Sequence, residues 1–116
     1  MKVSEYAALD ATGLAGLIRR KEISPQEVLD AAIEAIEQVN PALNAIVART
    51  YDAARAQLAK GVDMNAPFCG VPFVIKDEGG LMKDIPCTLG TRLSGRGIVT
   101  DHDTILGARF KKAGVV

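Results

Sequence analysis

Residues 24–41 read SPQEVLDAAIEAIEQVNP, and this stretch encodes the clearest helix of the chain. Ser24 can cap the helix, and Glu27, three residues later, completes the pattern of a capping box. One apolar stripe recurs at helical spacing, namely Val28, Ala32, Ile36 and Val39. We expect a helix over residues 25–39, ended by Pro41, because proline cannot continue the backbone hydrogen-bond ladder.

Weaker patterns extend outward from this helix. They predict helices over residues 10–21 and 51–60 and short strands over residues 45–48 and 73–75. A last helix is expected to start at Asp103 as its cap and to end at Gly114, where a left-handed residue belongs. Val115 and Val116 then resemble the start of a strand, so the chain looks cut within an element.

The distribution of glycine divides the chain. Two of the 11 glycines, Gly13 and Gly16, lie in the first half, and glycine is typical of loops that need special backbone geometry. We therefore expect a helical region over residues 1–60, strands and loops over 61–100, and a helix with the start of a strand over 101–116.

Composition limits the classes of function. The 116 residues are 48% hydrophobic, and 14 Lys and Arg balance 14 Asp and Glu. The chain therefore lacks the strong positive electrostatic field that is typical of nucleic-acid-binding proteins. No run approaches the roughly 20 apolar residues that span a bilayer, and no secretory signal opens the chain. Cys69 and Cys87 are interpreted as reduced, buried thiols in the cytoplasm.

Most familiar catalytic motifs are missing. The serines, namely Ser4, Ser24 and Ser94, lie outside any G-x-S-x-G or S-x-x-K motif, and Ser94 is interpreted as a turn residue. The lone histidine, His102, lies between Asp101 and Asp103, which favours a polar loop before a helix over a metal site. The chain has no second histidine that could activate Cys69 or Cys87 as a nucleophile.

Lys76 is the exception, because it directly follows the expected buried strand at 73–75. A surface lysine is the simpler interpretation. Burial of its neighbours would instead favour the uncharged amine, which can act as a general base, whereas contact with Asp77 would favour the ammonium. Gly79 and Gly80 form a loop that could approach a substrate closely. The residues alone thus provide a candidate base without a nucleophile.

An ordered series of motifs resembles the amidase signature family. Residues 70–77 (GVPFVIKD) resemble its G-[IV]-P-x-x-[IV]-K-D segment, and residues 88–93 (TLGTRL) resemble the T-x-G-[ST] part of its T-x-G-[ST]-x-x-L stretch. Residues 100–104 resemble the start of its D-[AH]-D-[AS] helix. In the first half, residues 23–28 and 40–45 are similar to its I-S-x-x-E-[VL] and N-P-x-[IL]-N-A segments. Each motif is weak alone, whereas the series covers nearly the whole chain.

The resemblance implies hydrolysis of linear carboxamides through a Ser–cis-Ser–Lys triad, without metal or organic cofactor. Lys76 matches the triad lysine, and Gly79 and Gly80 are weak candidates for substrate binding. The resemblance also implies an α/β fold, of which this chain is the N-terminal portion of a mixed sheet flanked by helices. The family's two serines lie in a Gly/Ser-rich segment that these 116 residues lack, so we expect an N-terminal fragment that is inactive alone.

Three alternatives stay open from the sequence. One is an amidotransferase component of the same family, although Glu78 differs from the K-D-N pattern of such components. A hydrolase of cyclic nylon oligomers is a possible subtype. A non-catalytic binding or interaction module would place Lys76 in solvent with no cleft around it, whereas the truncated enzyme would point it into a cleft. Apart from a small-molecule amide, the partner we expect is a second copy joined through unpaired strands.

Overall fold

The computed structural model of the chain describes residues 1–78 and 81–116. The chain forms two compact units. Met1–Phe73 and Ala113–Val116 make up the first, called the helical unit here, and Val74–Lys112 make up the second, called the loop unit.

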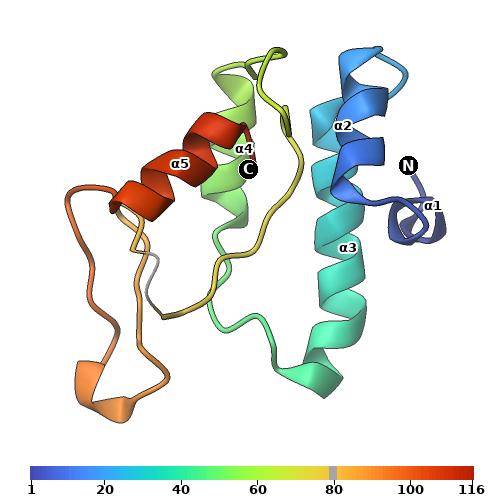
Figure 1. Cartoon of the computed structure of the whole chain (residues 1–116). Helices are drawn as coiled ribbons and strands as arrows, with labels where there is room; N and C mark the ends of the chain where they lie inside the picture. The colour runs from blue at the N-terminus through green and yellow to red at the C-terminus, as the bar shows by residue number, and fades with distance from the viewer. Residues whose placement is uncertain (79–80) are drawn as a thin grey trace. The chain divides into compact units, whose positions relative to one another are not determined.

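The helices of both units are labelled in Figure 1, apart from the short 3-10 helix η1. The helical unit contains α1 (Val3–Ala7), α2 (Ala11–Arg19), α3 (Pro25–Leu43) and α4 (Tyr51–Ala59). The loop unit contains η1 (Arg92–Ser94) and all of α5 (Ile105–Ala113) except its last residue.

The expected mixed α/β sheet is wrong for the described residues. These residues form helices and loops, and their one β pairing is an isolated antiparallel bridge between Cys87 and Ile98. Neither predicted strand, at 45–48 or 73–75, is present. The regular structure of the described residues is therefore helical. Hydrogen bonds of the 45–48 and 70–75 segments, described below, explain why neither forms a strand.

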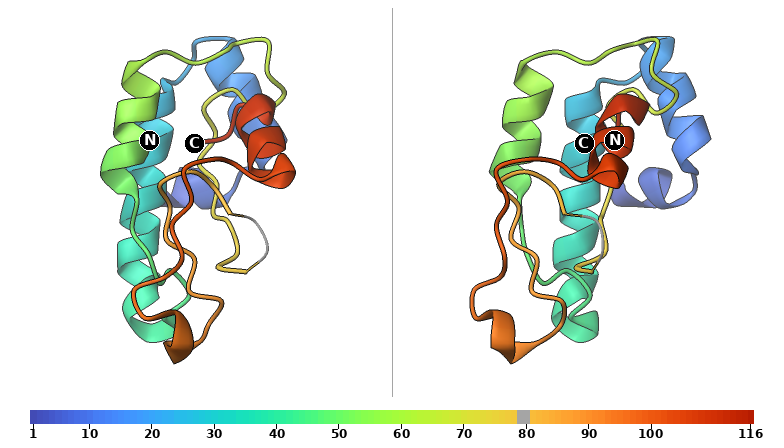
Figure 2. Two further views of the ribbon diagram at one scale, coloured as in Figure 1. Left: turned by 90° about the vertical axis from the view of Figure 1, so that its left-hand side faces the viewer. Right: turned by 60° about the vertical axis from the view of Figure 1, so that its left-hand side comes forward.

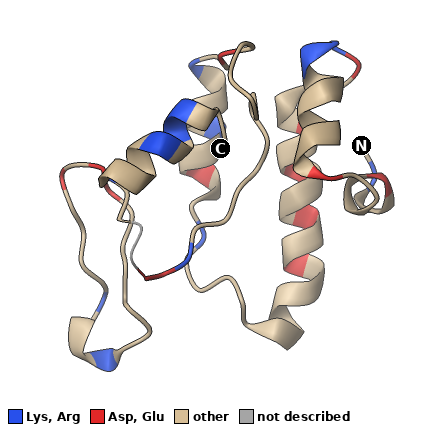
Figure 3. Ribbon diagram, in the orientation of Figure 1, with Lys and Arg blue, Asp and Glu red and all other residues tan. Residues whose placement is uncertain are grey.

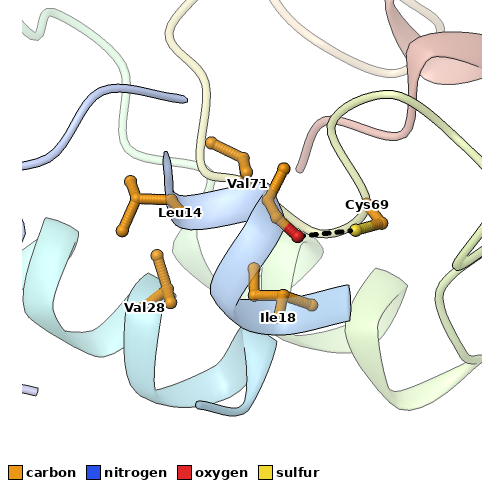
Figure 4. Packing of buried hydrophobic residues seen from close by; sticks show 6 residues of the cluster. Leu14, Ile18, Val28, Cys69 and Val71 are labelled. Carbon is orange, nitrogen blue, oxygen red and sulfur yellow. Dashed lines mark hydrogen bonds between the residues drawn. The ribbon is translucent and has the colours of Figure 1, made fainter. Parts of the chain in front are cut away.

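The helical unit is built around α3, which both α1 and α4 contact (Figure 2). The apolar faces of α2 and α3 meet the segment at 69–71 in one buried cluster, made of Leu14, Ala15, Ile18, Val28, Cys69 and Val71. In Figure 4 the Cys69 thiol donates a hydrogen bond to the main-chain oxygen of Ala15 at 3.5 Å. Periodic apolar residues thus position this unit, as the sequence predicts for α2 and α3.

The predicted start of α3 is confirmed, whereas its predicted end is wrong. The Ser24 hydroxyl accepts the Glu27 N–H at 3.2 Å, and the Glu27 carboxylate accepts the Ser24 N–H at 3.0 Å, as a capping box requires. The helix passes through Pro41 and ends at Leu43, where Asn44 takes the left-handed conformation. Its last turn is held in part by the Asn44 N–H, which donates to the Asn40 oxygen at 2.7 Å.

Asn40 also explains why residues 45–48 form no strand. Its side chain is buried, accepts the Ile46 N–H at 2.8 Å and donates to the Ile46 oxygen at 3.0 Å. Both main-chain groups of Ile46 are therefore bonded to a side chain and are not free for a ladder. The sequence pattern shows apolar residues here, but it does not show this local competitor.

The segment after Cys69 is extended, yet it too forms no strand. Val116 brackets Pro72, because its N–H donates to the Val71 oxygen at 2.9 Å and its oxygen accepts the Phe73 N–H at 2.7 Å. Gly70 likewise donates to the Gly114 oxygen at 2.7 Å. Val74 and Ile75 lie beyond these bonds and carry no regular structure, and Val74 is 60% exposed rather than buried.

Gly114 is the left-handed cap that the sequence predicts, with φ of 86°. A Cβ atom there would lie 2.6 Å from the Cβ of Ala66. The close approach, as well as the backbone conformation, therefore requires glycine at this position.

In the loop unit, two extended arms lead to η1 and back. They are joined by the Cys87–Ile98 bridge and by a hydrogen bond from the Asp84 N–H to the Thr100 oxygen at 3.0 Å. Figure 2 shows the two arms side by side, with η1 at the far end. Hydrogen bonds between loops, rather than an apolar core, thus shape this unit.

Asp103 does not cap α5 as predicted. Thr104 does, because its hydroxyl accepts the Gly107 N–H at 3.2 Å and donates to the Leu81 oxygen at 2.8 Å. The Asp103 carboxylate instead accepts the Lys83 N–H at 2.8 Å and the Lys111 ammonium at 2.7 Å. Asp103 therefore joins the 81–84 segment to the last turn of α5.

Charged residues are spread over the chain (Figure 3), and several of them form local ion pairs. Arg49 bonds Glu37 at 2.7 Å, and Arg55 bonds Asp30 at 3.2 Å, both within the helical unit. Such exposed pairs stabilise a fold only weakly, because solvent screens their attraction. No helix of the described residues is long and apolar enough to cross a bilayer.

Candidate functional site

Lys76, the lysine singled out by the sequence, lies in the loop unit with its side chain 81% exposed. Its Nζ lies 3.2 Å from Oε2 of Glu78, with which it forms an ion pair. The residue before it, Ile75, is only half-buried, so no buried strand shields the amine. This exposure is the outcome that the binding-module alternative predicts, and burial therefore gives no support to a catalytic role.

Asp77 turns away from the neighbouring lysine. Its carboxylate accepts the Thr88 N–H at 2.6 Å and the Thr88 hydroxyl in a second, short hydrogen bond. The hydrogen bonds from the Thr88 side chain and then its N–H lower the pKa of Asp77 below its usual value. The Asp77 carboxylate thus binds Thr88, and the carboxylate that pairs with Lys76 is that of Glu78.

The turn that holds Thr88 is itself tied down. The Ser94 hydroxyl donates to the main-chain oxygens of Thr88 at 2.6 Å and Thr91 at 3.0 Å. Ser94 is therefore the turn residue that the sequence predicts rather than an exposed nucleophile. Cys87, next to Thr88, is buried and exchanges hydrogen bonds of 3.0 and 2.8 Å with Ile98.

Gly79 and Gly80, the weak candidates for substrate binding, lie outside the described residues. The described site thus runs from Lys76 to Glu78 and includes the turn at 87–94. The sequence pattern singled out Lys76, but it did not predict that Asp77 would bond Thr88 or that Glu78 would pair with Lys76. The T-x-G motif that begins at Thr88 was the one local feature of the sequence that singled out this turn.

The other candidate groups have structural partners. Cys69 and Cys87 are both free thiols and both buried, as predicted. The exposed His102 lies 2.7 Å from Asp101 through Nδ1, a hydrogen bond that lowers the pKa of Asp101. Asp103 points instead to Lys83 and Lys111, and no metal-ligand cluster is found among the described residues.

Comparison with known proteins identifies the family. The family described as Amidase matches residues 27–116. The chain is 36% identical over 110 residues to the 6-aminohexanoate-cyclic-dimer hydrolase of Pseudomonas sp. strain NK87, covering 92% of this chain. It is 30% identical over its whole length to a glutamyl-tRNA(Gln) amidotransferase subunit of Methylacidiphilum infernorum.

A solved structure gives the same assignment. The structure of 6-aminohexanoate cyclic dimer hydrolase complexed with substrate matches 93% of this chain with a TM-score of 0.79 and 34% identity. The chain spans 22% of that structure, 21% of the Pseudomonas hydrolase and 22% of the amidotransferase relative. The matched residues include Lys76 and the turn at 87–94. The chain belongs to the amidase signature family.

Proposed function

We propose that this chain carries the lysine of an amide hydrolase and that Lys76 is its general base. The observation that supports this most directly is the position of Lys76 in GVPFVIKD, inside the range that matches the amidase family. The amine is reachable from solvent, as its 81% exposure shows. Its ion pair with Glu78 is on the surface, so it costs little to break when the amine takes up a catalytic role.

The proposed reaction follows from the triad that the family resemblance implies. The uncharged Lys76 amine takes the proton of a bridging serine, which in turn takes the proton of the nucleophilic serine. The nucleophilic oxygen attacks the amide carbonyl, the C–N bond breaks, and the leaving amine takes a proton. Water then attacks the acyl-enzyme ester and releases the carboxylic acid, which restores the serine and the amine.

The nucleophile is proposed to lie outside these 116 residues. Ser24 bonds the first turn of α3, and Ser94 bonds two carbonyl oxygens of its own turn. Both hydroxyls thus already have structural partners. We therefore propose that residues 1–116 by themselves do not turn over an amide.

The substrate is proposed to be a small amide. Linear carboxamides are the prediction from the family resemblance, and a cyclic amide dimer is suggested by the name of the 36% identical relative. The amidotransferase relative offers a second candidate function, but Glu78 replaces the asparagine of the K-D-N pattern. An assay panel should therefore contain a linear carboxamide, a cyclic dimer of an amino acid and glutamine.

The test uses the complete product of the gene that encodes these residues, alongside residues 1–116 alone. We expect turnover of at least one amide by the complete product and none by residues 1–116. Lys76→Ala should lower kcat by about 10²–10⁴-fold, the usual contribution of a general base. Lys112→Ala, an exposed lysine in the last turn of α5, is the matched control and should keep turnover within about 2-fold.

Two results would contradict the proposal. One is equal turnover by the Lys76→Ala and Lys112→Ala variants, which would assign Lys76 a surface role only. The other is complete absence of amide turnover from the complete product across the panel. Turnover by residues 1–116 that Lys76→Ala abolishes would overturn the narrower statement about the missing nucleophile.

A further inference from the structure

The loop unit contains a second acid beside the proposed base, and its contacts suggest a separate role. We propose that Asp77 is a positioning residue, which holds the backbone at Lys76 by binding the turn at Thr88. This inference rests on the proposed function, because it assigns Asp77 a role in the chemistry of Lys76. Asp77 itself would touch neither substrate nor reacting atoms.

Asp77 directly follows Lys76 in the chain. Consecutive Cα atoms are about 3.8 Å apart across a trans peptide, so a bond that fixes Asp77 also fixes the attachment point of Lys76. Both carboxylate oxygens of Asp77 are used, one by the Thr88 N–H at 2.6 Å and the other by the Thr88 hydroxyl. Two bonds to two atoms of one residue set the orientation of the carboxylate as well as its distance.

The turn at Thr88, to which Asp77 is bonded, is itself held in place. Thr88 follows the buried Cys87, which is bonded to Ile98 on the opposite arm of the loop unit. Its main-chain oxygen accepts the Ser94 hydroxyl at 2.6 Å. Asp77 is thus tied to a turn that is held from both sides, 11 residues further along the chain.

Side-chain packing does little to hold Lys76 in place. The side chain of Lys76 is 81% exposed, so packing does not hold it, and its partner Glu78 is itself 66% exposed. A catalytic group must be held within about 0.5 Å of its productive position by the residues around it. The two hydrogen bonds between Asp77 and Thr88 join the Lys76 backbone region to the turn that follows the buried Cys87.

The test compares two carboxylates of the same unit in the complete gene product. Asp77→Ala should lower kcat by roughly 10²-fold, because a displacement of about 1 Å is enough for such a loss, and should change KM by less than about 3-fold. Asp103→Ala is the matched control. It removes a carboxylate that likewise accepts a main-chain N–H, that of Lys83 at 2.8 Å, but that does not adjoin Lys76.

Thr88 provides a second, independent pair of variants. Thr88→Val removes the hydroxyl donor and keeps the shape, and should lower kcat in the same direction as Asp77→Ala. Thr88→Ser keeps the donor and should restore turnover. Because both residues act through one contact, the Asp77→Ala and Thr88→Val effects should not multiply when combined.

The outcomes separate this inference from the proposed function. If Lys76→Ala retains turnover, the proposed function falls and the role of Asp77 falls with it. If Lys76→Ala is inactive but Asp77→Ala behaves like Asp103→Ala, the positioning role alone is overturned. Where Asp77→Ala does not fold, the Thr88→Val and Thr88→Ser pair decides, and equal kcat in those two variants would overturn the inference.

Discussion

The two units of the chain are held together by different forces. In the helical unit, apolar side chains from α2, α3 and the 69–71 segment meet in a buried cluster. In the loop unit, the buried residues among those described are Cys87 and Gly107, and the contacts that shape it are made by the carboxylates and hydroxyls of a few polar side chains. Several of its large apolar residues are exposed, namely Val74, Leu89, Leu93, Ile98, Val99, Ile105 and Leu106.

The difference shows how the proposed catalytic lysine is placed. Apolar packing fixes the helices but not Lys76, which belongs to the unit shaped by hydrogen bonds. Hydrogen bonds are directional and short in reach, so they can set one backbone position without a core around it. We therefore expect variants of buried residues in the helical unit to lower its stability. Variants of the bonded polar residues in the loop unit should mainly change local geometry.

The largest expected effect is on the helical unit. Ile18 is 1% exposed and lies in the buried cluster, so Ile18→Ala should lower the free energy of unfolding by about 2–5 kcal/mol. Leu93→Ala, at a side chain 97% exposed in the loop unit, is the control and should change it by less than about 0.5 kcal/mol. Urea unfolding of both variants measures this, and equal losses would remove the contrast between the units.

A smaller effect is expected where a polar side chain supports the helical unit. Asn40→Ala leaves the N–H and C=O of Ile46 without their present partner and should cost about 1–3 kcal/mol. Asn65→Ala is the control, because the side chain of Asn65 is exposed. Circular dichroism during thermal unfolding would report the difference, and a neutral Asn40→Ala would show that water replaces both bonds.

The smallest effect is expected from acid in the loop unit. Hydrogen bonds from Thr88 lower the pKa of Asp77, and the Lys111 ammonium, followed by the Lys83 N–H, lowers the pKa of Asp103. A carboxyl with a lowered pKa in the folded state stabilises the fold above its unfolded pKa of about 3.9, and this contribution disappears as the pH falls through the folded pKa. Stability of the loop unit should therefore hold from pH 7 to about 5 and decrease below about 4.

Carbon-13 NMR of the two carboxyl groups checks this directly. Both should titrate with midpoints below about 3.9, the value for an unperturbed aspartate. In the Asp103→Asn variant the acid-dependent loss of stability should be smaller. Midpoints at or above the unperturbed value would mean that neither carboxylate is bonded in solution as the structure describes.

The sequence predicted the parts of the fold that depend on local pattern. The capping box of Ser24 and Glu27 and the left-handed cap at Gly114 are present because each depends on residues within a few positions. Pro41 misled the prediction of the end of α3, since the effect of one missing N–H is outweighed by the bonds of Asn40. The strand predicted at 45–48 failed for the same reason, because the Asn40 side chain occupies the backbone of Ile46.

The candidate site was predictable in identity but not in environment. Lys76 was found from a motif, whereas the partner of Asp77 lies 11 residues away and one of the two partners of Asp103, Lys83, lies 20 residues away. Contacts of that separation depend on the path of the loops, which no periodicity encodes. The same limit explains why Lys76 was expected behind a buried strand and is found at the surface beside Glu78.

The bonds that join Gly70 and Phe73 to Gly114 and Val116 have a consequence for synthesis of the chain. The helical unit is discontinuous, because the whole loop unit, Val74–Lys112, is inserted between its two parts. A ribosome adds roughly 5–20 residues per second, so roughly 2–9 s pass between the emergence of Phe73 and that of its partner, Val116. During that interval the helices can assemble, but the 70–73 segment that leads to Lys76 lacks its hydrogen-bond partners Gly114 and Val116.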